Sequence, residues 1–247
     1  MRIIISPAKK MNQDLDTLDY GNLPMFLEDT KKILGQLETM NYEELKAMWK
    51  CNDQIAKLNE ERIRGMALEA ALTPAILSYE GIQYQYMAPA VFETEAYHYI
   101  EEHLRILSGF YGMLKPFDGV VPYRLEMQAK LSIDGHKNLY AFWKDKMANE
   151  LFKETNCIVN LASKEYSKCI EPYLTDEIQF VTCVFGEVVD GKVKEKGTYA
   201  KMARGEMVRF MAEHKIEDIE QIKAFNHLGY RFEDAYSNET TYVFIKA

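Results

Sequence analysis

The sequence contains little cysteine and no long apolar run. No two cysteines form a Cys-x-x-Cys pair, and no histidine spacing completes a zinc set, so we expect reduced thiols and no metal site. No apolar run reaches the roughly 18 residues needed to cross a bilayer, and the start of the chain lacks the pattern of a signal peptide. These absences predict a cytoplasmic protein with no membrane partner. The cysteines are Cys51, Cys157, Cys169 and Cys183.

Several motifs of nucleotide-binding and hydrolytic enzymes are also missing. The sequence has no Gly-x-Ser-x-Gly, no phosphate-binding Walker loop and no Gly-x-Gly-x-x-Gly. His98 and His103 are five positions apart, which is not the His-Glu-x-x-His pattern of a zinc protease. We therefore expect no cofactor, and the composition favours no particular oligomeric state.

Basic residues are not in excess. The chain has 30 Lys and Arg against 38 Asp and Glu, a net charge of −8. This total argues against a protein whose whole surface binds nucleic acid. A local basic patch is still compatible with it, because phosphate contacts depend on the local potential. One such patch is predicted between Lys192 and Lys215, where seven Lys and Arg stand among three Glu.

The order of the hydrophobic patterns predicts a single α+β domain over residues 1–247, with a mixed sheet and a helical N-terminal third. The apolar run Ile3–Ile5 predicts a buried strand, and helical spacing dominates from Pro24 to about residue 66. Asp190-Gly191 lies between two alternating runs and predicts a β-hairpin. No linker, internal repeat or low-complexity tract divides the chain.

Four further segments are interpreted from their local patterns. Residues 75–87 are expected to form strand and turn, and residues 94–107 a helix that ends at Ser108-Gly109. Strict alternation over 122–131 predicts a strand, and the amphipathic run over 138–154 predicts one helix.

The opening stretch "RIIISPAKK" combines an apolar strand with an abrupt stop. Ser6-Pro7 ends the strand, because proline removes a backbone donor and fixes the turn. The tip of the strand should therefore present a hydroxyl group and the positive charge of Lys9. "NLASKEY" has the same character, because a strand ends there and Ser163 can cap a following helix that carries Lys164. Such strand ends collect anions.

The helix "TYAKMARGEMVRFMAEH" has an unusual second face. One face, with Tyr199, Met202, Met207 and Phe210 among its members, is expected to pack on the core. The opposite stripe contains Lys201, Gly205, Val208 and Ala212, flanked by Arg204 and Arg209. Small residues beside a lysine indicate that another element or a ligand approaches closely.

Two other segments are candidates for ligand contact. In "PYRLEM", Arg124 and Glu126 lie on one face, either as a structural ion pair or as an Arg fork for a phosphate or carboxylate that the Glu orients. "IAKLNEERI", within residues 52–66, has the spacing of a helix-hairpin-helix element, with Lys57 and Asn59 in place of the usual turn glycines. A plain helical hairpin is the alternative.

Six blocks, in order along nearly the whole chain, resemble the signature blocks of the YaaA family, bacterial cytoplasmic proteins associated with peroxide stress. They are "ISPAK" from Ile5, "LRILSGFYGMLKPFD" from Leu104, "PYRLEM" from Pro122, "LYAFW" from Leu139, "NLASKEY" from Asn160 and "KMARGEMVRF" from Lys201. The resemblance implies an unusual α+β fold that binds DNA through a positively charged cleft and a helix-hairpin-helix element. It also implies a role in limiting iron, and so hydroxyl-radical damage, during peroxide exposure.

Two functions from different classes are compatible with these residues. The first is a stress protein that binds DNA without sequence specificity. The second is an enzyme acting on a nucleotide or nucleobase, with Lys9 and Glu126 as catalytic candidates beside Arg124 and Lys201. An iron-handling or scaffold protein ranks last, because no ligand cluster for iron is visible. The residues expected to contact nucleic acid or phosphate are Lys9, Arg124, Lys164, Lys201, Arg204, Arg209 and Lys57, with Arg62 or Arg64 assisting.

Overall fold

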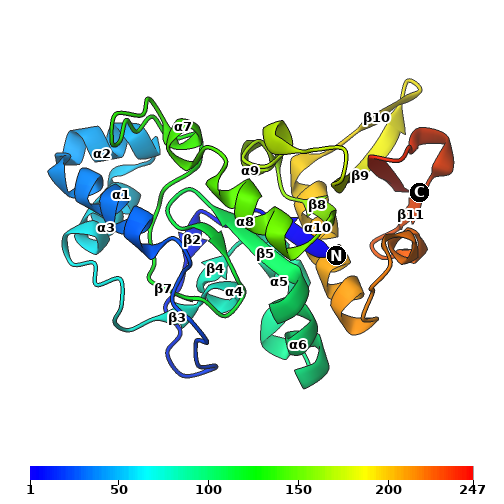
Figure 1. Ribbon diagram of the computed structural model, residues 1–247, viewed down its shortest axis with the longest axis horizontal. Helices are drawn as coiled ribbons and strands as arrows, with labels where there is room; N and C mark the ends of the chain where they lie inside the picture. Colours follow the sequence, from blue (N-terminus) through cyan, green and yellow to red (C-terminus); the bar gives the residue numbers. More distant parts are fainter. Residues whose placement is uncertain (247) are drawn as a thin grey trace.

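A mixed β-sheet forms the centre of the computed structural model, which describes residues 1–246 (Figure 1). Its strands lie in the order β11-β12-β9-β8-β1-β5-β6, and β10 pairs with β9 beside this path. The strands are β1 (Arg2–Ile5), β5 (Leu104–Ser108), β6 (Gly112–Leu114), β8 (Cys157–Leu161), β9 (Gln179–Val189), β10 (Lys192–Lys194), β11 (Tyr230–Phe232) and β12 (Thr241–Lys246). Two small ribbons lie apart from it: β2 (Lys10–Met11) with β4 (Tyr79–Glu80), and β3 (Thr73–Pro74) with β7 (Gly119–Val120).

The five central strands run parallel, and the antiparallel strands β6 and β11 close the two edges. A central parallel strand is covered on both faces and therefore reads as a continuous apolar run. Ile3, Ile4 and Ile5 of β1 are all fully buried, so the strand predicted at the start of the chain is confirmed. The predicted α+β class with a mixed sheet is confirmed as well.

The order of the strands reverses beside β1. The chain passes from β1 to its neighbour β5 on one side, and β8 then lies on the other side of β1, followed by β9 and β12. In open parallel sheets such a reversal leaves a crevice outside the carboxyl ends of the strands on either side of it. The residues that follow β1 and β8 therefore meet at this point.

Helices cover the sheet and fill one end of the molecule (Figure 1). α1, α2 and α3 gather at the end away from β10 and β11, which confirms the helical N-terminal third. The helices are α1 (Leu27–Thr39), α2 (Tyr42–Trp49), α3 (Asp53–Arg64), α4 (Ala75–Ser78), α5 (Ile82–Met87), α6 (Thr94–His103), α7 (Leu139–Trp143), α8 (Lys146–Glu154), α9 (Lys164–Ser167) and α10 (Gly197–Glu213), with 3-10 turns at Pro89–Val91, Glu171–Tyr173, Ile219–Ala224 and Asp234–Tyr236.

Local sequence signals set several of these boundaries. Asn41 caps α2 through a capping box, because its side chain accepts from the Glu44 N–H and the Glu44 carboxylate accepts from the Asn41 N–H. Asp190 and Gly191 have φ values of 53° and 71°, as a tight two-residue hairpin turn requires. The predicted hairpin between β9 and β10 is confirmed, and β11 and β12 form a second antiparallel pair.

Three predicted elements are wrong. Residues 75–87 are mostly helical, in α4 and α5, because their apolar side chains pack on α10 and other neighbours instead of a strand ladder. The helix α6 ends at His103, and residues 104–108 form the buried strand β5 beside β1. Residues 122–131 form no strand, although every odd-numbered side chain from Tyr123 to Leu131 is buried. Their alternation reflects a segment that packs on the core without a strand ladder and turns at Met127-Gln128.

Two expected helices also differ in detail. The run over 138–154 is broken at Lys144, whose positive φ of 45° separates α7 from α8. The turn expected within "IAKLNEERI" does not form, because Ile55 to Ile63 lie in the uninterrupted helix α3. The turn of the helical pair lies earlier, where Lys50 takes a left-handed conformation after α2. The helices α2 and α3 thus form a plain helical hairpin.

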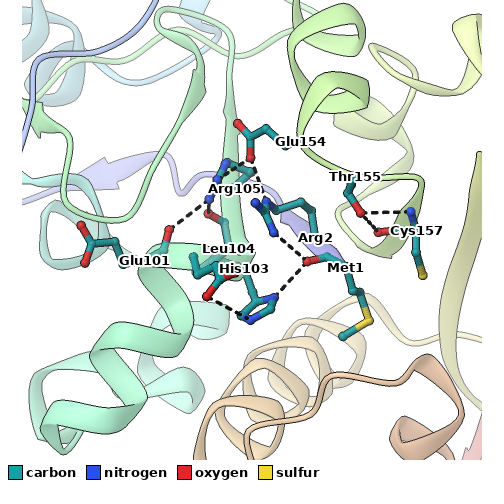
Figure 2. Close-up of polar contacts among 10 residues, drawn as sticks. Met1, Arg2, Glu101, His103, Leu104, Arg105, Glu154, Thr155 and Cys157 are labelled. Carbon is teal, nitrogen blue, oxygen red and sulfur yellow. Dashed lines mark hydrogen bonds and ion pairs between the residues drawn. The ribbon is translucent and has the colours of Figure 1, made fainter.

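Charged residues tie the amino ends of β1 and β5 to α8 (Figure 2). The Glu154 carboxylate accepts from Arg2 Nε at 2.8 Å and also from Arg105 Nη2. The His103 ring nitrogen Nδ1 lies 2.9 Å from the Met1 carbonyl oxygen. Arg105 is buried inside β5, and this pairing neutralises its charge.

No helix among residues 1–246 is both long enough and apolar enough to cross a membrane.

Candidate ligand-binding pocket

A pocket of about 370 Å³ opens at the carboxyl ends of β1 and β8, where the strand order reverses. Its walls come from four places: the segment after β1, the start of α5, the extended segment 122–127, and one side of α9 and α10. Its lining residues are Ser6, Pro7, Ala8, Lys9, Lys10, Glu80, Gly81, Ile82, Gln83, Tyr84, Tyr123, Arg124, Leu125, Glu126, Ser163, Glu165, Tyr166, Lys201 and Arg204. We call it the switch-point pocket.

Two serines join the strand ends at the base of this pocket. The Ser163 backbone N–H donates to Ser6 Oγ at 2.8 Å, and the two hydroxyl oxygens lie 3.1 Å apart. Ser163 occupies the cap position of α9 as predicted, but its hydroxyl faces Ser6 instead of capping the helix. The Tyr84 hydroxyl donates to the Ser6 carbonyl at 3.0 Å and so fixes the same turn against α5.

One carboxylate binds two cations on the next wall. Glu126 Oε2 lies 2.8 Å from Lys9 Nζ, and Glu126 Oε1 lies 3.3 Å from Arg124 Nη2. The Arg124 and Glu126 side chains are only 13% and 19% exposed, whereas the Lys9 side chain is 62% exposed. Arg124 and Glu126 thus lie on one face, as predicted. Lys9 is held at the tip of β1 by Glu126 and presents its remaining N–H donors to solvent.

Helix α5 packs against the small-residue stripe of α10. A Cβ added at Gly205 would lie 2.0 Å from the Gln83 carbonyl oxygen, so only glycine permits this approach. Val208 and Ala212 are buried too, while Tyr199, expected in the core, is 41% exposed. The neighbour predicted for this stripe is therefore a protein element. Lys201 and Arg204 lie at its pocket end.

Unpartnered donors are concentrated in this pocket. Among residues 1–246, four buried side-chain nitrogen or oxygen atoms have no hydrogen-bond partner, and three belong to its lining: Gln83 Nε2, Arg124 Nε and Arg204 Nε. All three can only donate. An unsatisfied buried donor costs about 1–3 kcal/mol, so this wall is suited to a ligand rich in acceptors.

Glu165 is a second carboxylate of the pocket that sequence reasoning missed. Its Oε1 accepts from the Gln128 backbone N–H at 3.2 Å, and no cation lies within ion-pair distance of it among residues 1–246. Burial, assisted by the nearby charge of Glu126, raises the pKa of Glu165. Glu126, in contrast, binds Lys9 and Arg124 with both oxygens. The two carboxylates thus have opposite environments within one pocket.

Buried tyrosines form the less polar part of the lining. Burial raises the pKa of Tyr123 to about 12, and burial also raises the pKa values of Tyr84 and Tyr166 well above their usual range. The Tyr123 hydroxyl lies 2.6 Å from Ser108 Oγ and 2.8 Å from the Tyr79 hydroxyl. These phenols stay neutral at physiological pH.

The predicted contact residues divide into two groups. Lys9, Arg124, Lys201 and Arg204 all line the switch-point pocket, as do Glu126 and Ser6. Lys164 and Arg209 do not; they pair with Glu171 and Glu213 respectively. Lys57 is exposed on α3, also outside the pocket.

Positive charge outweighs negative charge in the lining. Five cationic side chains face three carboxylates there, although the chain as a whole carries a net charge of −8. Among residues 1–246, Lys201 has no carboxylate within ion-pair distance. Nowhere in the same described residues do three or more His, Cys, Asp or Glu side chains gather as metal ligands would. The pocket therefore suits an anionic ligand held by donors.

Comparison with known proteins places the chain in a family. A family model described as peroxide stress protein YaaA matches residues 1–236. The chain belongs to the YaaA family. UPF0246 proteins of Desulfitobacterium hafniense and Lachnoclostridium phytofermentans are 61% and 58% identical to it, over 100% of this chain and 98% and 96% of theirs. A UPF0246 protein of Pediococcus pentosaceus is 52% identical, over 100% of this chain and 98% of its own length.

The predicted YaaA membership is thus confirmed, and with it the assignment to a peroxide stress family. Four of the YaaA-like blocks supply the pocket: Ser6 and Lys9 from the first, and Arg124 and Glu126 from "PYRLEM". The other two contributors are the blocks that begin at Asn160 and Lys201. Gln83 lies outside every block, and no local pattern in the sequence indicates its role.

Proposed function

We propose that this YaaA family member acts in the cytoplasmic peroxide stress response by binding a phosphate-bearing, nucleotide-like ligand in the switch-point pocket. The observation that carries this proposal is the group of three unpartnered buried donors, on Gln83, Arg124 and Arg204, in the lining of one cationic pocket. Phosphate oxygens are acceptors only, and the Arg guanidinium group matches them in geometry and charge.

The size and mixed character of the lining favour a ligand with more than a phosphate group. Small-molecule sites typically enclose about 300–1,000 Å³ and combine apolar surface with a few placed polar groups. The switch-point pocket, at about 370 Å³, lies within this range. Tyr84, Tyr123 and Tyr166 supply flat apolar surface beside the donors. A sugar or base attached to the phosphate would find its contacts there.

Non-specific DNA binding is the second candidate. The lysine side chains of the pocket are its most accessible cations: Lys9 and Lys10 are 62% and 70% exposed, and Lys201 is also exposed. Cations at the mouth of a pocket are suited to backbone phosphates, which give affinity without sequence preference. In this form the protein would cover DNA and help limit iron-dependent damage.

An enzyme acting on a nucleotide or nucleobase is a variant of the first candidate. The difference in environment between Glu126 and Glu165 favours it, because Glu126 binds two cations while burial raises the pKa of Glu165. Lys9 and Glu126 remain the catalytic candidates, and Glu165 joins them as a proton donor. Glu126→Gln should then abolish turnover while ligand binding survives.

The test measures binding of thymidine 5′-monophosphate by calorimetry and of a 20-base-pair duplex by fluorescence anisotropy, both at low salt. Arg124→Gln and Lys201→Gln should weaken nucleotide binding about 10-fold or more, because charge-assisted hydrogen bonds contribute about 1.5–3 kcal/mol. Lys164→Gln with Arg209→Gln is the matched control, because both side chains lie outside the pocket.

The outcomes separate the candidates. Binding of the nucleotide that is lost only in the pocket variants supports the proposal. Duplex binding with a steep salt dependence that also falls in the control variant favours DNA binding over a wider surface. A wild-type protein that binds no phosphate-bearing nucleotide at low salt contradicts the proposed function.

A further inference from the structure

A second depression adjoins the switch-point pocket on the far side of the Lys9–Glu126 ion pair. It encloses about 230 Å³ and shares Lys9 and Glu126 with the switch-point pocket. Its other lining residues are Met48, Trp49, Lys50, Gln128, Ala129 and Lys130. The ion pair, with 2.8 Å between Lys9 Nζ and Glu126 Oε2, therefore stands between two concave sites.

The segment 122–131, which turns at Met127-Gln128, leads from one site into the other. Its odd-numbered side chains are buried, and its even-numbered side chains are more exposed. Arg124 lines the switch-point pocket, Glu126 lines both sites, and Gln128 and Lys130 line the second. The alternation of buried and more exposed side chains thus places a row of polar residues along the two depressions.

The charge of the second depression favours an anion. Lys9, Lys50 and Lys130 stand there against the single carboxylate of Glu126. Lys50 and Lys130 are exposed, and neither lies within ion-pair distance of a carboxylate in residues 1–246. Buried Met48, Trp49 and Ala129 form an apolar floor between these cations. The site is small, cationic and partly apolar.

The wall between the depressions is held from the helical N-terminal third. Trp49 Nε1, at the end of α2, donates to the Arg124 carbonyl at 2.5 Å. The left-handed conformation of Lys50 directly after α2 turns the chain at the rim of the second depression. The helical hairpin α2–α3 thus sets the position of the row that carries Arg124 and Glu126.

We infer that the second depression is an anion subsite, and that the ligand of the switch-point pocket extends across the Lys9–Glu126 pair to place a second phosphate between Lys50 and Lys130. This inference rests on the function proposed above. It names the ligand class: a dinucleotide or short single strand, with at least two phosphate groups, instead of a mononucleotide. Lys9 would then lie between the two phosphates.

The test compares two probes, thymidine 5′-monophosphate and the 5′-phosphorylated dinucleotide of thymidine, on the wild type and two double variants. Lys50→Gln with Lys130→Gln removes both subsite charges and keeps most of each side-chain stem. Lys137→Gln with Lys168→Gln removes two exposed lysines that line neither depression and is the matched control. Thermal unfolding of each variant confirms that the fold is intact.

We expect the wild type to bind the dinucleotide about 10-fold more tightly than the mononucleotide. The Lys50/Lys130 variant should lose that advantage, keep mononucleotide affinity within about 2-fold, and lower the salt slope for the dinucleotide by about 0.7, because one phosphate contact is lost. Equal wild-type affinity for both probes, or an equal loss in the control variant, would overturn the subsite alone. A wild type that binds neither probe would overturn the proposed function together with it.

Discussion

Gly205→Ala is expected to destabilise the protein out of proportion to the single methyl group it adds. An alanine Cβ at this position would lie 2.0 Å from the Gln83 carbonyl oxygen, 2.9 Å from its carbonyl carbon and 3.0 Å from the Met87 nitrogen. All three atoms belong to the backbone of α5. No rotation of a side chain relieves the overlap, so α5 and α10 must move apart.

The loss in unfolding free energy can be estimated. Overpacking a core costs about 1–3 kcal/mol when side chains can adjust, and a clash with backbone lies at or beyond the upper end. In a domain of roughly 150–250 residues, each kcal/mol lowers the melting temperature by about 2–4 °C. A loss of about 3 kcal/mol therefore predicts a melting temperature lower by about 6–12 °C.

Gly197→Ala is the control, because the same helix begins there and a Cβ at this glycine meets nothing within 4 Å. We expect its unfolding free energy to stay within about 0.5 kcal/mol of the wild type or to rise slightly. Thermal and urea unfolding, both followed by circular dichroism, measure both variants. A Gly205→Ala protein that melts within about 2 °C of the wild type would refute the close approach of α5 and α10.

Three further predictions test other parts of the fold. Burial raises the pKa of Asp118 from 3.8 to about 6, so its contribution to stability is complete below pH 3.8 and is lost as the pH rises through 6. Asp118→Asn should therefore raise the unfolding free energy by up to about 3 kcal/mol at pH 7 and not at pH 4, as urea titrations at the two pH values will show. Ser6→Ala should lower the unfolding free energy by about 1–2 kcal/mol. This loss should exceed that of Ser163→Ala, because only Ser6→Ala leaves the Ser163 N–H without its acceptor. Equal losses of free energy in urea unfolding would contradict this. Asn41→Ala removes the capping box of α2 and should cost about 1 kcal/mol, measured as a lower melting temperature; an unchanged value would show that the cap contributes nothing.

Elements with local signals were predictable from the sequence. The capping box at Asn41 and the Asp190-Gly191 turn are complete within a few residues, so their structures follow from their own chemistry. The strand β5 was not predictable in this way. Its sequence continues the helical pattern of α6, and only the pairing with β1 and the charge neutralisation of Arg105 by Glu154 make it a buried strand.

The residues of the candidate pocket were likewise predictable only where their own segments carried a signal. Lys9, Arg124 and Lys201 were singled out from their own segments, and the structure places all three in one pocket. Gln83 and Glu165 were not, because their positions depend on how closely α5 meets α10 and on how the segment after Arg124 turns past α9. Lys164 and Arg209 lie outside the pocket, where they pair with Glu171 and Glu213.

The central position of β1 has a consequence for synthesis on the ribosome. The first strand to be made has neighbours that are made much later, since Ile5 is in register with Ile106 on one side and with Leu161 on the other. At about 5–20 residues per second, the second neighbour follows the first strand by roughly 8–30 s. Until β8 has been made, Ile3, Ile4 and Ile5 can pair with at most one of their two neighbouring strands. A nascent chain thus keeps one side of this apolar strand unpaired, and its switch-point pocket can be complete only after Arg204, about four fifths of the way along the chain, has emerged.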